Sequence, residues 1–417
     1  MSKIIGVIGV GYVGLPLAIK FSDHYKVISY DYNKKRILEL LKHYDVNQEY
    51  TKVDLKKNNL IFTNNFNSLK KCNYFIITLP TPLNKKNSPD LDALVKLCKN
   101  LGKIIKKNDT IIFESTVYPG ATEDLFLPNI EKVTKLKVNE DFFLGYSPER
   151  INPGDKFHRI DNIKKIVSGS NKKSLNIVKN LYKKIVKAGV YSVSSIKVAE
   201  LSKVLENTQR FVNIALINEI SILCNKLKIQ TKEVVDAASS KWNFMRVYPG
   251  LVGGHCISVD PLYLSYKSKF YKLNPDIIET SHKINNNVAN FIIKNFNKLI
   301  NKKKPKVLIL GATFKENCSD LRNSGIIKIL KLLNKIGVIP TVIDPYVNTN
   351  PKLNIKGNFN FKKIFQKNFY DVIIILVAHE IFKKMGLKKI KKLSKKKDCI
   401  IMDVKSLFSQ HKVNFQL

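Results

Sequence analysis

The amino-acid sequence predicts an α/β protein with two Rossmann-like domains, each built on a doubly wound parallel sheet and joined by a long central helix and a helical segment. In the first half of the chain, short apolar runs alternate with segments of helical periodicity. The same alternation returns after residue 305, and the chain between the two series has helical periodicity alone. We therefore expect an N-terminal domain at 1–195, a central helical domain at 196–300 and a C-terminal domain at 301–417.

The N-terminal series begins with the apolar run Ile4–Ile8, which is expected to be a strand buried on both faces of a parallel sheet. A glycine-rich turn follows it, and then a helix that runs to Phe21. Further strands are expected at residues 26–30, 74–79, 110–114 and 142–146. This order of elements is typical of βαβ units.

The central segment begins with one long helix. From Ile196 to about Leu227, apolar residues recur at helical spacing without a proline or glycine. More helix is expected up to Trp242, and again from about Pro275 to Ile300 after an intervening loop. Because the long helix carries apolar residues on more than one side, we expect it to form the interface of a homodimer or a higher homo-oligomer.

The C-terminal series repeats the strand pattern at residues 306–310, 341–344, 371–377 and 399–404. Its first strand ends in a second glycine turn, Gly311-Ala312-Thr313-Phe314-Lys315, which lacks the later glycines of a dinucleotide fingerprint. This turn is expected to bind something other than a second dinucleotide. Lys315 is placed to meet a phosphate, and Asp320 and Arg322 are either ligand contacts or a local salt bridge.

Length and composition indicate a globular, multidomain protein. The chain has 417 residues, too many for one ordinary core, and 44% of them are hydrophobic. No apolar run is long enough to span a bilayer, and we expect no signal peptide and a cytoplasmic location. The six cysteines are scattered without a CxxC pair, so most are expected to be reduced thiols in the core.

The net charge of +39 suggests nucleic-acid binding as an alternative function. The lysines, however, are spread over the whole chain and no nucleic-acid-binding motif accompanies them. The densest run, residues 388–397, has Ile390 and Leu393 at helical spacing, as on a solvated helix face. We expect no specific nucleic-acid partner, although weak nonspecific binding at low salt follows from the charge.

A dinucleotide fingerprint follows the first strand: Gly9-Val10-Gly11-Tyr12-Val13-Gly14. Its glycines allow a tight turn and close approach to a pyrophosphate at the start of the next helix. Asp31 ends the second expected strand about 20 residues later, where a carboxylate binds the ribose hydroxyls and repels a 2′-phosphate. The pattern predicts NAD as the cofactor rather than NADP; the alternative is a plain glycine turn beside a surface aspartate.

The residues around Cys256 suggest covalent chemistry. The cysteine follows Gly253-Gly254 and stands four residues before Asp260, in a loop rather than in a core element. Its thiolate could attack an aldehyde and become a thioester, with Asp260 activating the hydrolytic water. The alternative is a buried thiol beside a structural aspartate. A zinc site on His255 and Cys256 has no second ligand pair at suitable spacing, so no metal is expected.

The long helix supplies Lys203 and Asn207, which are four residues apart and share one helical face. An ammonium and an amide that project together can stabilise an oxyanion. The alternative is a solvated face, although the surrounding residues are apolar.

Over essentially its whole length, the sequence resembles the nucleotide-sugar 6-dehydrogenases, the family of the UDP-glucose and GDP-mannose enzymes. The resemblance includes the fingerprint, the cysteine loop, the second glycine turn and four further motifs in the same order. These are Pro80-Thr81-Pro82, Glu114-Ser115-Thr116-Val117, Pro148-Glu149-Arg150 and Glu200-x-x-Lys203-x-x-x-Asn207.

The resemblance implies roles for matching residues. Cys256 corresponds to the thioester nucleophile, Lys203 and Asn207 to the oxyanion pair, and Asp260 to the water-activating carboxylate. Glu149 corresponds to a glutamate that assists proton transfer and hydrolysis, and Thr116 to a residue that holds a nearby water. The implied NAD contacts are Gly9, Gly11, Tyr12, Val13, Gly14, Asp31, Arg36, Thr81 and Thr116. The implied UDP-sugar contacts are Glu149, Arg150, Lys203, Asn207, Gly253, Gly254, Lys315 and Arg322, and the central helix is the implied dimer interface.

Within the family, the loop resembles the UDP-N-acetylhexosamine branch. The glucose branch typically has a lysine before the aspartate, where this chain has Val259. The stretches Ser147–Asp155 and Trp242-Asn243-Phe244 agree with this branch. One departure is His282, which stands where many relatives have an arginine and affects any phosphate or partner-subunit contact there.

We therefore expect a UDP-N-acetylhexosamine 6-dehydrogenase that uses two NAD+ per sugar to make a uronic acid for surface polysaccharide. The same chemistry on UDP-glucose is the nearer alternative. A two-electron dehydrogenase of the 6-phosphogluconate type also has a Rossmann domain and a long helix with lysine and asparagine. That class needs neither Cys256 nor a second Rossmann-like domain.

Overall fold

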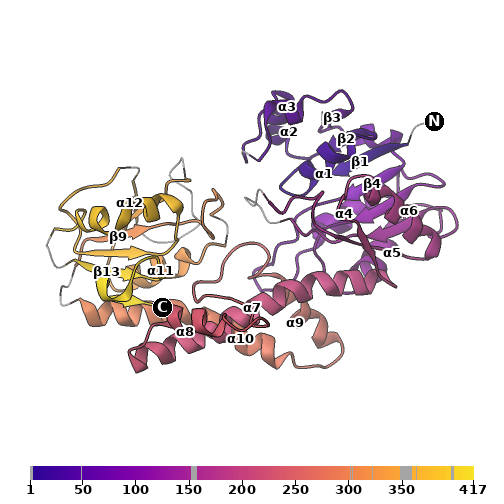
Figure 1. Cartoon of the computed structure of the whole chain (residues 1–417). Coiled ribbons are helices and arrows are strands. Elements are labelled where there is room, and N and C mark those ends of the chain that lie inside the picture. Colours follow the sequence, from indigo (N-terminus) through magenta and orange to yellow (C-terminus); the bar gives the residue numbers. More distant parts are fainter. Residues whose placement is uncertain are drawn as a thin grey trace. The chain divides into compact units, whose positions relative to one another are not determined.

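The computed structural model describes residues 3–47, 49–151, 157–300, 302, 304–321, 323–347, 359–362, 364–395 and 399–417. The chain forms two compact units. Unit 1 comprises Met1–Glu206 and Leu262–Asn274, and unit 2 comprises Asn207–Pro261 and Pro275–Leu417. Each unit contains a parallel α/β sheet with helices on both faces (Figure 1), so the predicted fold class is confirmed.

The described part of unit 1 contains an eight-stranded sheet in the order β3-β2-β1-β4-β5-β6-β7-β8. Its strands are β1 Ile4–Ile8, β2 Lys26–Tyr30, β3 Leu60–Thr63, β4 Tyr74–Ile77, β5 Thr110–Phe113, β6 Phe143–Tyr146, β7 Lys165–Gly169 and β8 Val190–Ser192. The five strands expected from the sequence are present, some with shorter ends. Strands β6 and β7 pair antiparallel, a departure from the predicted parallel sheet.

The helices of unit 1 cover both faces of this sheet because successive strand residues point to opposite sides. Helices α1 (Gly14–Phe21), α2 (Lys34–Leu41) and α6 (Lys172–Lys183) pack against one set of strand side chains, which includes Val7 and Ile76. Helices α4 (Asp92–Leu101) and α5 (Leu127–Glu131) pack against the other set. Shorter helical segments are α3 Lys52–Leu55, η1 Phe66–Lys71 and η2 Thr122–Phe126.

The central helices are α7 (Ile196–Leu227), α8 (Thr231–Ala238), α9 (Asp260–Phe270) and α10 (Asp276–Leu299). The long helix and the helix after Pro275 are confirmed. The expected helix up to Trp242 ends at Ala238 instead, and α9 was not predicted. Helix α9 starts with Asp260-Pro261, a common helix start, but its apolar residues do not keep to one face.

Unit 2 contains, in its described residues, a six-stranded parallel sheet in the order β11-β10-β9-β12-β13-β14. Helices α10 and α11 (Ile326–Lys335) pack on one face, and α12 (Glu380–Lys391) packs on the other. All four expected strands are confirmed. The strands are β9 Val307–Leu310, β10 Thr341–Ile343, β11 Asn360–Phe361, β12 Val372–Ile375, β13 Ile400–Asp403 and β14 Phe415–Gln416, with a short η3 at Gln410–Lys412.

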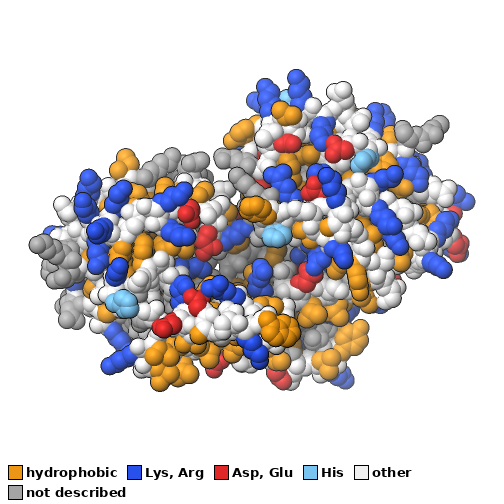
Figure 2. Space-filling model, viewed as in Figure 1, with side chains coloured by type: hydrophobic (Ala, Val, Ile, Leu, Met, Phe, Trp, Pro, Cys, Tyr) orange, Lys and Arg blue, Asp and Glu red, His pale blue; other side chains and the backbone are white. Residues whose placement is uncertain are grey.

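On the face drawn in Figure 2, the lysines do not gather in one patch. Figure 2 shows Lys and Arg side chains scattered over the visible surface of both units. In the lysine-rich run, Ile390 and Leu393 are buried, as expected for the inner side of a solvated helix; residues 396–398 lie outside the described part. Among the helices that the structure describes, none is long and apolar enough to cross a membrane.

Candidate active site

The first glycine turn leaves space beside its backbone. Gly9 has φ +96°, and a Cβ on Gly14 would lie 1.8 Å from the Gly9 carbonyl oxygen, so neither position accepts a larger residue. A Cβ on Gly11 would meet nothing within 4 Å. Val13 is the N-cap of α1, which begins at Gly14. The open space at Gly11 and the helix N-terminus fit the pyrophosphate of a dinucleotide.

Asp31 lies beside this turn at the end of β2. Its Oδ2 accepts a hydrogen bond from the Val10 amide at 2.9 Å, and its Oδ1 accepts one from the Asn33 amide at 2.9 Å. Arg36 is buried and donates from Nε to the Val10 carbonyl at 3.0 Å, and its Nη1 pairs with Asp45 at 2.9 Å. The predicted cofactor residues Asp31 and Arg36 are thus brought to the glycine turn; Asp45, which supports Arg36, was not predicted.

Replacing Asp31 with asparagine is expected to lower kcat/KM for NAD+ by about 10-fold, the scale of one lost charged hydrogen bond. The asparagine can still accept from the Val10 amide, but the charge that repels a 2′-phosphate is gone, so kcat/KM for NADP+ should fall less or rise. Steady-state rates with both cofactors measure this. The control is Asp23→Asn, an exposed aspartate paired with Lys57; unchanged discrimination in Asp31→Asn would remove its predicted role.

Two further predicted residues meet at the carboxyl ends of β4 and β5. The Thr81 hydroxyl donates to the Thr116 carbonyl at 2.7 Å, and the Tyr263 hydroxyl donates to the Thr81 carbonyl at 2.5 Å. Ser115 donates to the Leu79 carbonyl at 2.7 Å. These bonds join the two loops at the sheet edge where α/β proteins bind nucleotides.

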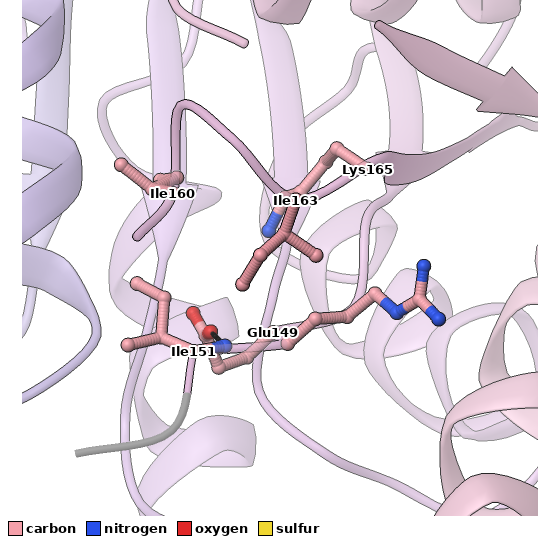
Figure 3. A pocket seen from close by; sticks show the side chains of 6 residues that line it. Glu149, Ile151, Ile160, Ile163 and Lys165 are labelled. Carbon is pink, nitrogen blue, oxygen red and sulfur yellow. Dashed lines mark hydrogen bonds between the residues drawn. The ribbon is translucent and has the colours of Figure 1, made fainter. Parts of the chain in front are cut away.

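Glu149 follows β6 and is buried (8% exposed). Its Oε1 accepts from the Ile151 amide, and its Oε2 has no hydrogen-bond partner among the described residues. Arg150 pairs with Glu206 at 2.7 Å and donates to the Lys164 carbonyl at 2.8 Å. Figure 3 shows the small pocket formed here, which is lined by Glu149, Arg150, Ile151, Ile160, Ile163 and Lys165.

Lys203 is buried on α7 (7% exposed), so it is not part of a solvated helix face. One turn earlier, Glu200 accepts from the amides of Gly120 at 2.6 Å and Thr122 at 2.9 Å, which anchors the chain that follows Thr116 to α7. Burial raises the pKa of the Glu200 carboxyl to about 7. The motif Glu200-x-x-Lys203 therefore combines an anchoring carboxyl group with a buried amine.

Cys256 is the exposed member of the six cysteines. Burial raises the pKa of the Cys72 thiol to about 12 and also raises that of Cys98, as expected for inert core thiols. The alternative that Cys256 is a buried thiol is therefore wrong. Its carbonyl accepts from the Asp260 amide at 2.8 Å, which ties the cysteine to the start of α9.

Asp260 is buried (2% exposed) and its Oδ2 accepts from the Asn207 side-chain amide at 2.6 Å. Asn207 is half-buried on α7. The predicted water-activating carboxylate and one member of the predicted oxyanion pair are thus brought together within unit 2.

The cysteine loop packs on the second glycine turn. A Cβ on Gly253 would lie 2.8 Å from the Asn323 carbonyl oxygen, and one on Gly254 would lie 2.8 Å from the Phe314 ring. Gly254 also has φ +89° and donates to the Asn323 carbonyl at 3.2 Å. The two glycines therefore allow the loop to approach the turn that carries Lys315.

Asp320 lies 3.4 Å from the His255 ring nitrogen, in a local pair. Arg322, the other predicted contact, lies outside the described residues.

In the second turn, Thr313 stands where the first turn has Gly11. His282, the departure from the family pattern, is half-buried beside the Phe211 ring at 6.3 Å between centroids, and burial lowers its pKa.

Asn218 is a supporting residue that the sequence did not reveal. It is fully buried on α7, accepts from the Gly250 amide at 2.8 Å, and donates to the Gly250 carbonyl at 3.1 Å and to Asn285 at 2.8 Å. It fixes Gly250, which precedes the cysteine loop, to the helix. An asparagine in an apolar helical pattern carries no sequence feature that points to this contact.

Replacing Asn218 with alanine is expected to lower the free energy of unfolding of unit 2 by roughly 2–4 kcal/mol, because three buried polar groups lose their partner. Urea unfolding measures the change. The control is Asn225→Ala, on the exposed side of the same helix. Equal stability of the two variants would contradict the anchoring role.

The fold and these residues define a dinucleotide-dependent oxidoreductase with a second nucleotide-binding domain. Residues 3–186 match the NAD binding domain of the UDP-glucose/GDP-mannose dehydrogenase family, residues 197–287 its central domain and residues 308–410 its UDP binding domain. The chain belongs to this family and is an NAD-dependent dehydrogenase, as predicted.

Similar proteins agree over the whole chain. The UDP-N-acetyl-D-glucosamine 6-dehydrogenase of Pseudomonas aeruginosa is 45% identical, with 99% of both chains covered. The enzyme of the same name from Salmonella typhi is 45% identical over 96% of this chain and 95% of its own. A solved UDP-D-ManNAc dehydrogenase from Pyrococcus horikoshii has a TM-score of 0.88 at 28% identity, covering 99% and 98% of the two chains.

Proposed function

We propose that this enzyme oxidises the C6 hydroxyl of a UDP-N-acetylhexosamine to the uronic acid, as a precursor for surface polysaccharide. The observation that carries the proposal is the exposed thiol of Cys256, in a loop packed on the turn that carries Lys315 and tied to Asp260. The relatives at 45% identity are named for UDP-N-acetyl-D-glucosamine, which supports an acetamido sugar over glucose.

The cofactor fits the residues at the first glycine turn. Asp31, Arg36 and the backbone of Gly9–Gly14 would hold it, together with Thr81 and Thr116. When bound, NAD+ accepts the hydrides, one molecule for each of the two oxidations.

The thiolate of Cys256 attacks the C6 aldehyde that the first oxidation leaves, forming a C–S bond and a thiohemiacetal. Lys203 and Asn207 stabilise the oxyanion by donating hydrogen bonds. Loss of the C6 hydride then gives a thioester on Cys256. Attack by water releases the uronic acid and regenerates the thiol.

Proton transfer falls to the carboxyl groups. Asp260, which accepts from Asn207, activates the hydrolytic water, and Glu149 takes up and returns protons at C6 with a water held by Thr116. Lys315 contacts the nucleotide part of the substrate. Further substrate contacts are Arg150, Gly253, Gly254 and Arg322; Arg150 is already paired with Glu206, so its contact requires that pair to rearrange or to be shared.

We further propose three domains at 1–195, 196–300 and 301–417, and a homodimer formed through α7. Exposed apolar residues along that helix support the dimer: Val198, Leu201, Leu205, Leu216, Leu223 and Leu227.

The test of the proposed function is the amount of NADH formed per molecule of UDP-GlcNAc, UDP-GalNAc, UDP-ManNAc and UDP-glucose, with the product identified by mass. Two NADH per sugar and preference for an acetamido sugar are expected. Preference for UDP-glucose would keep the mechanism and overturn the substrate class. One NADH per sugar would mean that the reaction ends at the aldehyde and that Cys256 lacks the proposed role.

A further inference from the structure

A closed polar network lies beside Glu149 in the core of unit 1. The ammonium group of Lys165, on β7, is 2.5 Å from Glu114 Oε2, just after β5, and both side chains are buried. The other carboxyl oxygen of Glu114 accepts from the Tyr182 hydroxyl on α6. The Lys165 ammonium also lies 5.4 Å from the centre of the Tyr182 ring. Such a fully buried ion pair is costly to desolvate and contributes little to stability by itself, which favours a functional reason for it.

The network is joined directly to the chain that carries Glu149. Lys165 donates a second hydrogen bond, at 3.0 Å, to the carbonyl of Pro148, the residue directly before Glu149. Figure 3 shows Glu149 and Lys165 on the same pocket, surrounded by Ile151, Ile160 and Ile163. At a buried site, charges act on one another more strongly than in water.

The Glu114 carboxyl group pairs with the Lys165 ammonium group and also interacts electrostatically with Glu149. Burial raises the pKa of the Glu114 carboxyl, Lys165 opposes this rise, and the charge of Glu149 adds to it. The pKa of Tyr182 is raised by burial and then by Glu114. Arg150, the residue after Glu149, pairs with Glu206 of α7. Glu149 keeps one buried oxygen without a hydrogen-bond partner among the described residues.

We propose that Glu114 and Lys165 are positioning residues for Glu149: Lys165 holds the peptide that precedes it, and the ion pair sets the charge beside its carboxyl group. This inference rests on the proposed role of Glu149 in proton transfer. It assigns a function to two residues that contact neither the substrate nor the cofactor in the proposed reaction.

The test is the pH dependence of kcat. Glu114→Gln keeps the shape of the side chain but removes a negative charge that acts on Glu149 and leaves the Lys165 ammonium group without its counter-charge. The acid limb of the pH profile should therefore move to lower pH by about 1 unit. Lys165→Met removes the cation, so the limb should move to higher pH by about 1 unit. The double variant removes both charges and should return the limb to within about 0.5 unit of the wild type. Opposite shifts that cancel are not expected from a merely structural defect.

Two further variants make the result decisive. Glu149→Gln should abolish the limb and lower kcat by about 10²-fold. Lys164→Met, at an exposed neighbour of Lys165, should leave the limb in place. Circular dichroism and NAD+ binding show whether each variant is folded. If Lys165→Met does not fold, the shift in Glu114→Gln is sufficient to test the proposal.

An unmoved limb in folded Glu114→Gln, or a limb that survives Glu149→Gln, would overturn this inference alone. A wild-type enzyme that reduces no NAD+ with any UDP-sugar would instead overturn the proposed function.

Discussion

Replacing Cys256 with serine is expected to lower the rate of uronic acid formation by on the order of 10³-fold or more, the scale seen when a nucleophile is lost. A serine hydroxyl is a much weaker nucleophile than a thiolate, and the ester that it forms hydrolyses more slowly than a thioester. The variant should therefore accumulate as a covalent ester with the sugar nucleotide, visible as an increase in protein mass. Rapid-quench assays combined with mass spectrometry measure both effects.

The matched control is Cys399→Ser, since Cys399 is a buried thiol with no role in the proposed reaction. That variant should keep the rate and show no adduct. Cys256→Ala, which can form neither ester nor thioester, should make no uronic acid. If Cys256→Ala still oxidises the sugar fully at a near-normal rate, the thioester mechanism is wrong.

Local patterns were sufficient to predict the long helix and most of the strands, whereas β3, β7, β8, β11 and β14 were not predicted. The continuous apolar runs at β1, β4 and β9 and the unbroken periodicity of α7 are strong local features, and each lies where the sequence placed it. Helix α9 was missed because its apolar residues do not form one stripe. The antiparallel pairing of β6 and β7 was missed because β7 itself was not predicted as a strand.

The sequence predicted the residues that would take part in the chemistry better than the residues that hold them in place. The fingerprint and the cysteine loop carry residue types and spacings that the chemistry requires. The residues that hold them in place carry no such pattern, since their partners are distant in the chain. Asn218 reaches Gly250, 32 residues away, and Lys165 reaches Glu114, 51 residues away.

The exposure of two side chains, Cys256 and Lys203, decided between alternatives that the sequence left open. From the loop alone, Cys256 was equally compatible with a buried core thiol, and a lysine on a helix is usually solvated. The thiol is exposed and Lys203 is buried, the reverse of both alternatives. Exposure depends on how the surrounding elements pack, which no window of the sequence contains.

Replacing Asp260 with asparagine is expected to slow thioester hydrolysis by about 10²–10⁴-fold, the usual contribution of a general base. Asparagine has the same shape and can still accept the hydrogen bond from Asn207, so the cysteine loop should keep its position. Both oxidations should then proceed at nearly the wild-type rate in the first turnover. Stopped-flow traces should show a burst of about two NADH per active site, followed by very slow turnover.

The accumulated species should be a thioester on Cys256, which hydroxylamine releases and which disappears in the Cys256→Ala background. Asp236→Asn is the matched control, because Asp236 is a surface aspartate of the same unit, paired with Lys232 and Arg246; it should turn over without a burst. Loss of the burst itself in Asp260→Asn would show that the charge of Asp260 is needed before the thioester forms, as a base in the oxidations, because the hydrogen bond from Asn207 is kept. Since the two roles predict opposite burst amplitudes, one experiment separates a carboxylate that activates the hydrolytic water from one that acts in the oxidations.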